Sequence, residues 1–213
     1  EAFLAAIGPA TKIVYLCSPN NPTGNALPLE SLRRVADSFE GITVVDEAYI
    51  DFSASPSCLE LLPSHPNLVV LQTLSKAWAG AGIRLGMAFA SEAIISLLSK
   101  VKYPYNISLP SQEKAFEILS RTAEKAGEVR LLLNERGRMA TALQGLSFVR
   151  KVYPSDANFL LVRVDDADGR YRGLVAQGIV VRNRNRVCLC EGCLRITVGS
   201  PKENDALLRA LGS

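Results

Sequence analysis

In the first half of the chain, apolar runs alternate with helical patterns. The runs predict buried strands over residues 12–17, 42–49, 68–75 and 84–90. Helical periodicity follows the first run over residues 28–39, with a proline at its start, and the last run over residues 91–100. Strands that are apolar on both faces and separated by helices or long connections indicate a largely parallel sheet covered on both sides. This part of the chain is therefore predicted to be α/β.

The pattern changes after the helix-breaking stretch KYPYNISLPS at residues 102–111. Helical periodicity covers residues 111–143, longer than an average helix, and a break is expected near Gly127 or Gly137. Strands are then predicted over residues 147–153, 157–164, 178–182 and 193–199, with helices over 167–177 and 202–211. The interleaving predicts a smaller α+β domain. We place the boundary near residue 110, which gives domains 1–110 and 111–213.

Composition narrows the class of protein. Of the 213 residues 48% are hydrophobic and 21% charged, and the net charge is +3, so composition favours neither a nucleic-acid nor a membrane partner. No apolar run approaches the roughly 18 residues that span a bilayer, and residues 1–4 lack the basic start of a signal peptide.

The five cysteines are odd in number and unevenly spaced, which fits a reducing compartment. The group Cys188, Cys190 and Cys193 has the pattern C-x-C-x-x-C, but a structural zinc site needs about four ligands and the single histidine, His65, is far away in sequence. Ordinary buried thiols are the favoured interpretation, and no metal is expected.

Two predicted strands end in polar residues, where an open α/β sheet binds ligands. The first runs into SPNNPTGN, which by itself is a common tight turn. The second ends in VVDEAY, where Asp46 follows apolar residues and Tyr49 comes three residues later. A carboxylate at such a place is costly unless it meets a cation or hydrogen-bond donors. Asp46 is thus either a helix cap or Asx turn, or the partner of a positive charge on a ligand.

A third predicted strand leads into TLSKAWAGAGIRLG, which contains Lys76 and, eight residues later, Arg84. A lone loop lysine is usually a surface residue. Here it stands among the hydroxyls of Thr73 and Ser75, and hydroxyls, backbone N–H groups and an arginine make a phosphate cradle. The glycine spacing is wrong for a dinucleotide site. An amine, a carboxylate and a phosphate cradle together suit pyridoxal phosphate.

The ordered set NNPTG, DEAY, TLSKAWAGAGIRLG and CLRITVG resembles the fold-type-I pyridoxal-phosphate aminotransferases of class I/II. PSDANFLLVR and GIVVRNRN…GCLRITVG are most similar to the histidinol-phosphate aminotransferase subfamily. The resemblance covers essentially the whole chain. It implies the cofactor pyridoxal 5'-phosphate and, for the intact enzyme, a cytoplasmic homodimer that acts on small molecules in histidine biosynthesis. The transfer would link L-histidinol phosphate and 2-oxoglutarate with imidazole acetol phosphate and L-glutamate.

The resemblance also implies roles for single residues. Lys76 resembles the catalytic lysine that holds the cofactor aldehyde as a Schiff base and shuttles the proton between the substrate α-carbon and the cofactor. Asp46 resembles the partner of the pyridine nitrogen, and Asn21 and Tyr49 the donors to the phenolic oxygen. Ser75 and Arg84 resemble phosphate ligands, with Thr73 a weaker candidate.

For the substrate, Arg195 resembles the residue that grips the α-carboxylate, since Leu194, Ile196 and Val198 alternate with it and leave it on the other face. Arg182 resembles the residue that holds the substrate phosphate, assisted by Tyr105. Arg184 and Arg186 are interpreted as surface charge, and Asn158 as no more than a supporting group.

In the resemblance, domain 1–110 corresponds to the C-terminal part of the cofactor-binding large domain and domain 111–213 to the small C-terminal domain. The long N-terminal portion of these enzymes is absent, so we expect the 213-residue chain to be inactive by itself. Two groups of alternatives stay open: another class I/II enzyme, such as an aromatic aminotransferase or a threonine-phosphate decarboxylase, and a non-catalytic fragment of the fold.

Overall fold

The computed structural model describes residues 2–212 and divides them into two compact units. The first unit contains the residues up to Pro19 and Ala26–Lys125, and the second contains Asn20–Asn25 and the residues from Ala126 onward. The short turn 20–25 thus groups with the second unit, and the chain passes from one unit to the other inside a helix. The domain boundary near residue 110 stays a prediction. Each unit is described by itself below.

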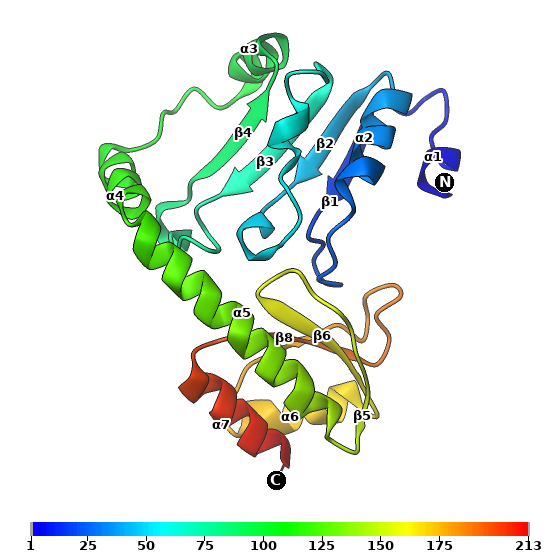
Figure 1. The fold of residues 1–213 in the computed structure, drawn as a ribbon, viewed down its shortest axis with the longest axis vertical. Helices are drawn as coiled ribbons and strands as arrows, with labels where there is room; N and C mark the ends of the chain where they lie inside the picture. Colours follow the sequence, from blue (N-terminus) through cyan, green and yellow to red (C-terminus); the bar gives the residue numbers. More distant parts are fainter. Residues whose placement is uncertain (1, 213) are drawn as a thin grey trace. The chain divides into compact units, whose positions relative to one another are not determined.

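The first unit is built on a four-stranded sheet in the order β1-β2-β3-β4 (Figure 1). Strands β1 (Ile13–Cys17), β2 (Ile42–Asp46) and β3 (Leu68–Thr73) are parallel, and β4 (Gly86–Ala90) runs antiparallel to β3. The prediction of a largely parallel sheet in an α/β arrangement is confirmed. Because β3 and β4 are antiparallel, the loop between them begins and ends at the edge where the parallel strands finish.

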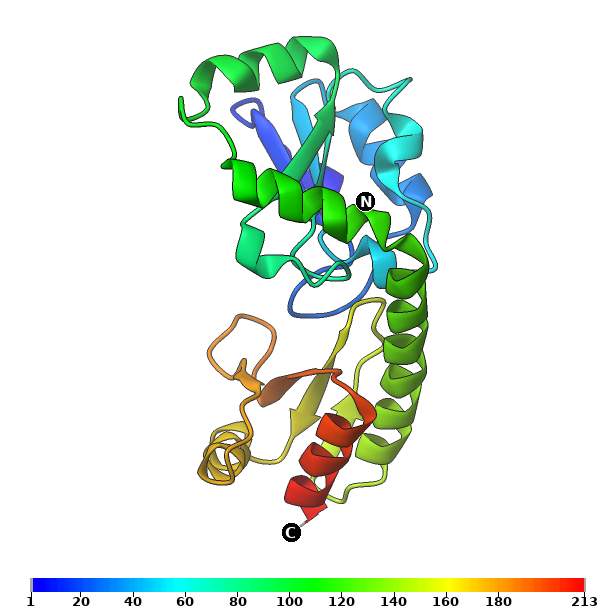
Figure 2. The ribbon, with the colours of Figure 1, turned by 90° about the vertical axis from the view of Figure 1, so that its left-hand side faces the viewer.

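One face of this sheet is packed and the other is partly open. Val14 and Leu16 of β1 join Val45 and Val70 in an apolar core against α2 (Leu29–Ser38) and the short helix η2 (Cys58–Leu61), which lie on the same side of the sheet (Figure 2). On the other face Ile13 is 61% and Tyr15 53% exposed. Alternate residues of a strand point to opposite faces, so Ile13 and Tyr15 lie on the face away from this core. The described residues leave that face of β1 exposed, and the expectation that both faces are covered is wrong there.

The remaining elements of the first unit are α1 (Ala2–Ala5), η1 (Ile50–Phe52), η3 (Ala81–Ile83), α3 (Glu92–Val101) and α4 (Leu109–Ser120). Of these, α1 precedes β1, η1 and η3 lie between strands, and α3 and α4 follow β4. Two predicted strands were too long: β2 ends at Asp46, so Tyr49 lies in a turn, and β3 ends at Thr73. The prediction that β4 begins at Arg84 was also wrong, because Arg84 has a left-handed backbone with φ 56°.

The long helical pattern of residues 111–143 forms two helices, α4 and α5 (Thr122–Gln144). The break lies at Arg121, with φ −92° and ψ 40°, where the Arg121 N–H turns back to the Ile118 carbonyl at 3.1 Å. The prediction of a break at Gly127 or Gly137 was wrong. Both glycines lie inside α5, since a single glycine costs a helix only about 1 kcal/mol.

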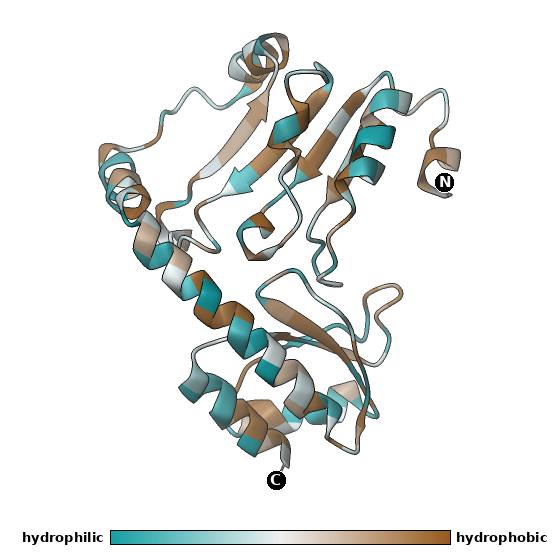
Figure 3. Cartoon of the chain, viewed as in Figure 1, coloured by the Kyte–Doolittle hydropathy of each residue, from teal (hydrophilic) through white to brown (hydrophobic). Residues whose placement is uncertain are grey.

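The second unit contains an antiparallel sheet in the order β5-β6-β8-β7. Its strands are β5 (Val149–Val152), β6 (Phe159–Val164), β7 (Arg182–Asn183) and β8 (Cys193–Thr197), and its helices besides α5 are α6 (Ala167–Ala176) and α7 (Pro201–Gly212). Alternate residues of β6 and β8, such as Leu160 and Ile196, join apolar residues of α5, α6 and α7 in one core. In Figure 3, β6 is largely brown, the colour of hydrophobic residues, and α7 carries both hydrophilic and hydrophobic residues.

The strand predicted at residues 178–182 is mostly a helix end. Gly178 has φ 76°, and the Ile179 N–H bonds to the Leu174 carbonyl at 2.9 Å, which closes the C-terminus of α6. Regular pairing begins only at Arg182. The apolar residues before Arg182 therefore match the sequence pattern of a strand but do not form a strand.

Candidate active site

Asp46 is the last residue of β2, and both of its carboxylate oxygens accept a hydrogen bond. The Ala48 N–H donates to Oδ1 at 3.0 Å, and the Tyr15 hydroxyl on β1 donates to Oδ2 at 2.8 Å. Burial, followed by this hydrogen bond to Asp46, raises the pKa of Tyr15 to about 12, so the phenol is protonated and acts as the donor at neutral pH. The carboxylate is thereby held in a defined orientation at the carboxyl edge of the sheet.

The register places further polar groups on the same face. Cys17 is opposite Asp46, Asp46 is opposite Leu71, and Thr73 lies two residues beyond Leu71 at the end of β3. Residues two apart on a strand share a face. Asp46 and the hydroxyl of Thr73 thus lie on one face at neighbouring strand ends, which is where an open α/β sheet binds ligands.

Lys76 lies three residues after the end of β3, in a loop that is held by hydrogen bonds within its own backbone. The Ala79 N–H bonds to the Lys76 carbonyl at 3.0 Å, and the Gly80 N–H to the Leu74 carbonyl at 2.8 Å. A Cβ at position 80 would lie 2.9 Å from that carbonyl oxygen, so glycine is required there. Ala79 has φ 51°, a strained left-handed conformation for a residue with a Cβ. Such strain persists where the surrounding structure imposes it, as at ligand sites.

Aromatic rings and an ion pair surround this loop. The Nζ atom of Lys76 lies 5.1 Å from the centroid of the buried Tyr49 ring. Two residues later, Trp78 lies under Lys125, whose Nζ is 4.7 Å from the indole centroid and also pairs with the carboxylate of Asp51. The structure therefore brings Lys76 and Tyr49 together, and Lys125 links the loop to the residues that follow Tyr49.

Ser75 and Thr73 form a short hydroxyl chain. The Thr73 Oγ1 atom donates to Ser75 Oγ at 2.9 Å or to the Leu85 carbonyl at 3.2 Å and accepts from the Ser75 N–H at 3.1 Å. Ser75 is thus left with its own hydroxyl proton to donate to a ligand, which makes it a better anion donor than Thr73. Arg84 is exposed, and one of its terminal nitrogens donates to the Ala81 carbonyl at 2.9 Å.

In the second unit, the NNPTG turn is fixed by its own hydrogen bonds. The Gly24 N–H bonds to the Asn20 carbonyl at 2.7 Å, and the Gly24 carbonyl accepts from the Asp156 N–H at 2.7 Å. Gly24 has φ 83°, and a Cβ there would lie 2.5 Å from Ser155 Oγ. Only glycine fits both the conformation and this contact. The turn is therefore a rigid support for Asn21.

Asn21 is joined to Arg195 of β8. The guanidinium donates to Asn21 Oδ1 at 2.8 Å and lies 4.8 Å from the centroid of the Phe159 ring. As predicted, Arg195 lies on the face opposite to Leu194, Ile196 and Val198, which are buried in the core. Because Asn21 accepts through its oxygen, its amide N–H₂ group is left to donate elsewhere.

Arg182 is paired directly with Arg195 across β7 and β8. Opposed side chains in an antiparallel ladder lie about 5 Å apart at Cβ, where two like charges destabilise each other unless an anion lies between them. The prediction that both arginines serve a substrate thus gains a geometric basis. Tyr105 belongs to the first unit and lies in the loop after α3, 84% exposed, so its role stays a prediction.

The cysteine group has no such arrangement. Cys190 and Cys193 pack with Leu161 in a small buried cluster, burial raises the pKa of both thiols, and Cys188 is exposed. Across residues 2–212, His, Cys, Asp and Glu side chains form no group of three or more able to hold a metal ion. The described part of the chain also has no helix long and apolar enough to cross a bilayer.

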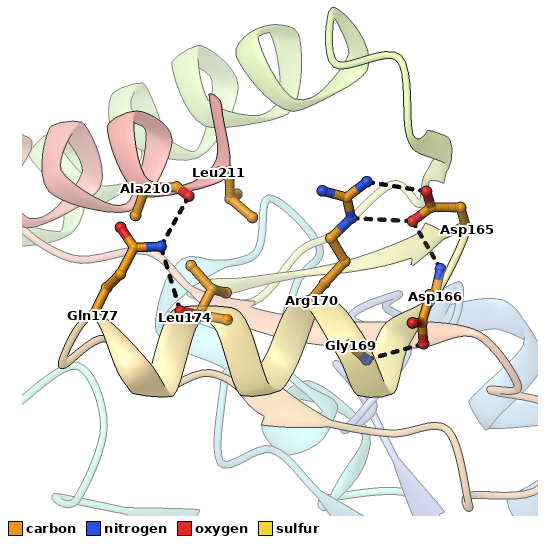
Figure 4. Close-up of a pocket in the computed structure, with 9 residues that line it drawn as sticks. Asp165, Asp166, Gly169, Arg170, Leu174, Gln177, Ala210 and Leu211 are labelled. Carbon is orange, nitrogen blue, oxygen red and sulfur yellow. Dashed lines mark hydrogen bonds and ion pairs between the residues drawn. The ribbon is translucent and has the colours of Figure 1, made fainter. Parts of the chain in front are cut away.

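A cavity of about 400 Å³ in the second unit contains none of the predicted site residues. It lies beside α6 and α7 (Figure 4), where Arg170 pairs with Asp165 through two hydrogen bonds of 3.0 and 3.1 Å. Gln177 bonds there to the backbone carbonyls of Gly173 and Ala210. The polar groups of this cavity thus form hydrogen bonds with other groups of the fold. The candidate chemistry lies instead at the strand ends of the first unit and, in the second unit, on the sheet face that carries Arg182 and Arg195.

Comparison with known proteins agrees with this chemistry. The sequence model of the family described as aminotransferase class I and II matches residues 1–211. The chain belongs to this family. A relative from Parabacteroides distasonis named histidinol-phosphate aminotransferase is 57% identical over 211 residues, covering 99% of this chain and 61% of the relative. The chain thus spans about three fifths of the length of that relative.

Solved structures of an aminotransferase and of a decarboxylase share the fold. The histidinol-phosphate aminotransferase from Sinorhizobium meliloti in complex with pyridoxal-5'-phosphate matches with a TM-score of 0.86 and 26% identity, over 98% of this chain and 59% of that one. The L-threonine-O-3-phosphate decarboxylase from Porphyromonas gingivalis also gives a TM-score of 0.86 at 26% identity, over 97% and 65%. The fold therefore accommodates both reactions, and the choice between them depends on the site residues.

The residues present fit the cofactor of this class I and II family. Asp46 would offer a carboxylate to a cationic ring nitrogen, Lys76 an amine to an aldehyde, and Ser75 and Arg84 donors to a phosphate. Sequence reasoning missed Tyr15 and Lys125. Tyr15 could have been found from strand alternation, because it lies two residues before the end of β1, whereas nothing in the sequence links Lys125 with Trp78 and Asp51.

Proposed function

We propose that this protein transfers an amino group between L-histidinol phosphate and 2-oxoglutarate with the help of pyridoxal 5'-phosphate. The products would be imidazole acetol phosphate and L-glutamate, a step in histidine biosynthesis. The relative from Parabacteroides distasonis carries this name at 57% identity. The arrangement of the chain's own residues supplies the physical support.

The cofactor, when bound, supplies an aldehyde that takes up the amino group and a cationic ring that withdraws electrons from the substrate α-carbon. Asp46 would keep the proton on the ring nitrogen, because hydrogen bonds orient both oxygens of its carboxylate at the carboxyl edge of the sheet. Lys76 would hold the aldehyde, and its amine would move the proton of the substrate α-carbon. Its place above Tyr49 in a closed loop limits where this amine reaches.

Other residues would hold the cofactor's oxygens. Ser75 would donate its hydroxyl proton to the phosphate, and Arg84 would add a positive charge. Tyr49 and Asn21 are the proposed donors to the phenolic oxygen. The assignment of Asn21 agrees with its hydrogen bond to Arg195, which occupies the amide oxygen and leaves the amide N–H₂ group as a donor.

The observation that carries the substrate assignment is the pairing of Arg182 with Arg195 in register on one face of the sheet. Two adjacent guanidinium groups suit a ligand with two negative charges. At neutral pH 2-oxoglutarate has two carboxylates, and a phosphate monoester has a charge of about −1.5 to −2. Arg195 would grip the α-carboxylate of glutamate or 2-oxoglutarate, and Arg182 would hold the phosphate of L-histidinol phosphate, with Tyr105 assisting. L-Phenylalanine has only one such group, so it would engage only one of the two guanidinium groups.

We further propose that the active form is a cytoplasmic homodimer. The first unit exposes many large apolar side chains over α3, α4 and the loop between them: Leu97, Leu98, Val101, Tyr103, Tyr105, Ile107, Leu109, Phe116 and Leu119. Exposed apolar surface of this kind is typical of interaction sites. The absence of a charge bias is consistent with a small-molecule enzyme that binds neither nucleic acid nor membranes.

The proposal is tested by single-turnover reactions of the cofactor-loaded protein, expressed from its natural gene, with three amino donors. L-Histidinol phosphate should convert the bound cofactor at least about 100-fold more efficiently than L-phenylalanine or L-threonine phosphate, measured as kcat/KM from the cofactor absorbance. Arg182→Ala should lower the value for L-histidinol phosphate by about 10- to 100-fold, because a charge-assisted contact is lost.

Lys76→Ala serves as the blank and should show no conversion with any donor. Release of carbon dioxide from L-threonine phosphate would instead identify a decarboxylase. Equal rates for the phosphorylated and aromatic donors would contradict the substrate assignment, and unchanged turnover in Arg182→Ala would contradict the role of that residue.

A further inference from the structure

Tyr15 and Asp46 are brought together by the register of the two strands that carry them. Cys17 of β1 is directly opposite Asp46, and Tyr15 precedes Cys17 by two residues on the same face. Two residues of a strand advance about 6.6 Å, a distance that a long tyrosine side chain can span along the sheet. The 2.8 Å hydrogen bond from the Tyr15 hydroxyl to Oδ2 is the result.

This hydrogen bond restricts the rotation of the carboxylate, which is ordinarily broad in an aspartate side chain. The terminal torsion of an aspartate side chain is broad, so one hydrogen bond leaves the carboxylate plane free to turn. Here the Ala48 N–H holds Oδ1 and Tyr15 holds Oδ2, one donor on each oxygen. A carboxylate has about four acceptor positions, so lone pairs remain on both oxygens for a ligand.

The rest of Tyr15 contributes little to the fold. The residue is 53% exposed and lies on the open face of β1, while its neighbours Val14 and Leu16 are in the core. A tyrosine needed only for packing would not place its hydroxyl on a carboxylate at the ligand edge of the sheet.

We propose that Tyr15 is a positioning residue for Asp46: its hydroxyl holds the carboxylate in the orientation from which Asp46 binds the protonated ring nitrogen of the cofactor. This rests on the proposed function, because it presumes that Asp46 binds that nitrogen. Tyr15 acts through Asp46 and does not itself touch the cofactor. Its hydroxyl therefore matters only while the carboxylate of Asp46 is present.

The test is a double-mutant cycle on cofactor affinity, in the protein expressed from its natural gene. The dissociation constant of pyridoxal 5'-phosphate is measured by quenching of tryptophan fluorescence, to which Trp78, two residues from Lys76, contributes. Tyr15→Phe should raise the constant about tenfold, the cost of a lost hydrogen bond to a charged group. The control Tyr171→Phe, at a tyrosine that packs against the core of the second unit, should leave it unchanged.

In the Asp46→Ala background, Tyr15→Phe should change the constant by less than about twofold, because the group through which it acts is gone. Circular dichroism and thermal unfolding show whether each variant folds. If Asp46→Ala does not fold, Asp46→Val takes its place, since valine suits a strand and also lacks an acceptor.

The outcomes separate this inference from the proposed function. A wild-type protein that does not bind the cofactor would overturn both. A wild type that binds tightly, with Tyr15→Phe binding equally well, would overturn only the role of Tyr15. The same holds if Tyr15→Phe weakens binding equally with and without Asp46, because Tyr15 would then act independently of the carboxylate.

Discussion

The two sheets present their candidate chemistry in different ways. In the first unit it stands where strands end: Asp46 is the last residue of β2, and Ser75 and Lys76 lie just past β3. In the second unit it stands within strands, where Arg195 and Arg182 face each other across β8 and β7. A strand-end residue is held by the turns and loop that follow the strand, whereas a residue within a strand is held by the ladder.

This difference has a physical consequence. Where a loop positions the functional group, the backbone of the loop is the sensitive part, as the requirement for glycine at position 80 shows. Where paired strands position the functional group, the hydrogen bonds of the sheet fix the backbone, and the identity of the side chain decides the function. Substitutions in the two units should therefore fail for different reasons.

The largest effect is expected from changing a side chain on the ladder. Arg195→Lys should lower kcat/KM for L-glutamate by about 10²- to 10³-fold, because lysine cannot make the forked contact to a carboxylate. It also loses the guanidinium that lies over Phe159 and bonds to Asn21. Single-turnover kinetics of the cofactor-loaded enzyme measure this.

Arg186→Lys is the matched control, since Arg186 is exposed and outside the paired strands. Its kinetics should match those of the wild type. If the Arg195 and Arg186 variants behaved alike, a positive charge alone would be enough, and the argument from side-chain identity would fail.

A backbone change in the loop of the first unit should come next. An added Cβ in Gly80→Ala would lie 2.9 Å from the Leu74 carbonyl oxygen and 3.1 Å from Ile118 Cδ1. We expect a loss of about 1–3 kcal/mol in the free energy of unfolding, the usual cost of overpacking, measured by urea denaturation.

Gly82→Ala tests the same chemical change two residues away, where a Cβ would meet no atom within 4 Å. Its unfolding free energy should stay within about 0.5 kcal/mol of the wild type. Equal losses in the two variants would show that the close approach at Gly80 is not what shapes the loop.

The smallest effect concerns the ionisation of Tyr15. Burial, the hydrogen bond to Asp46 and the charge of Asp46 raise the pKa of this phenol to about 12. Asp46→Ala removes the hydrogen bond and the negative charge but keeps the burial of the phenol. The pKa should therefore fall toward the ordinary value of about 10 without reaching it. Phenolate absorbance after a rapid alkaline pH jump, compared with Tyr15→Phe to assign the signal, measures it; an unchanged pKa would mean that the two residues are not coupled.

Strand alternation predicted much of both sheets and the face on which Arg195 lies, because Leu194 and Ile196 need to be buried whatever the topology is. It failed where local geometry competes with pattern. Gly178 and Ile179 close a helix although their neighbours are apolar, and Arg121 ends a helix although glycines nearby looked weaker. Hydrogen bonds in a turn are decided by backbone conformations that hydrophobicity does not encode.

The sequence by itself determined the kinds of chemical group: an amine, a carboxylate, hydroxyls and arginines at recognisable positions after and within strands. Only the tertiary structure decided which of these groups meet. The register of β1 against β2 gave Asp46 a partner in Tyr15, and the register of β7 against β8 set Arg182 beside Arg195. Contacts between strands depend on which residues pair across the ladder, and a one-residue slip would reverse every face.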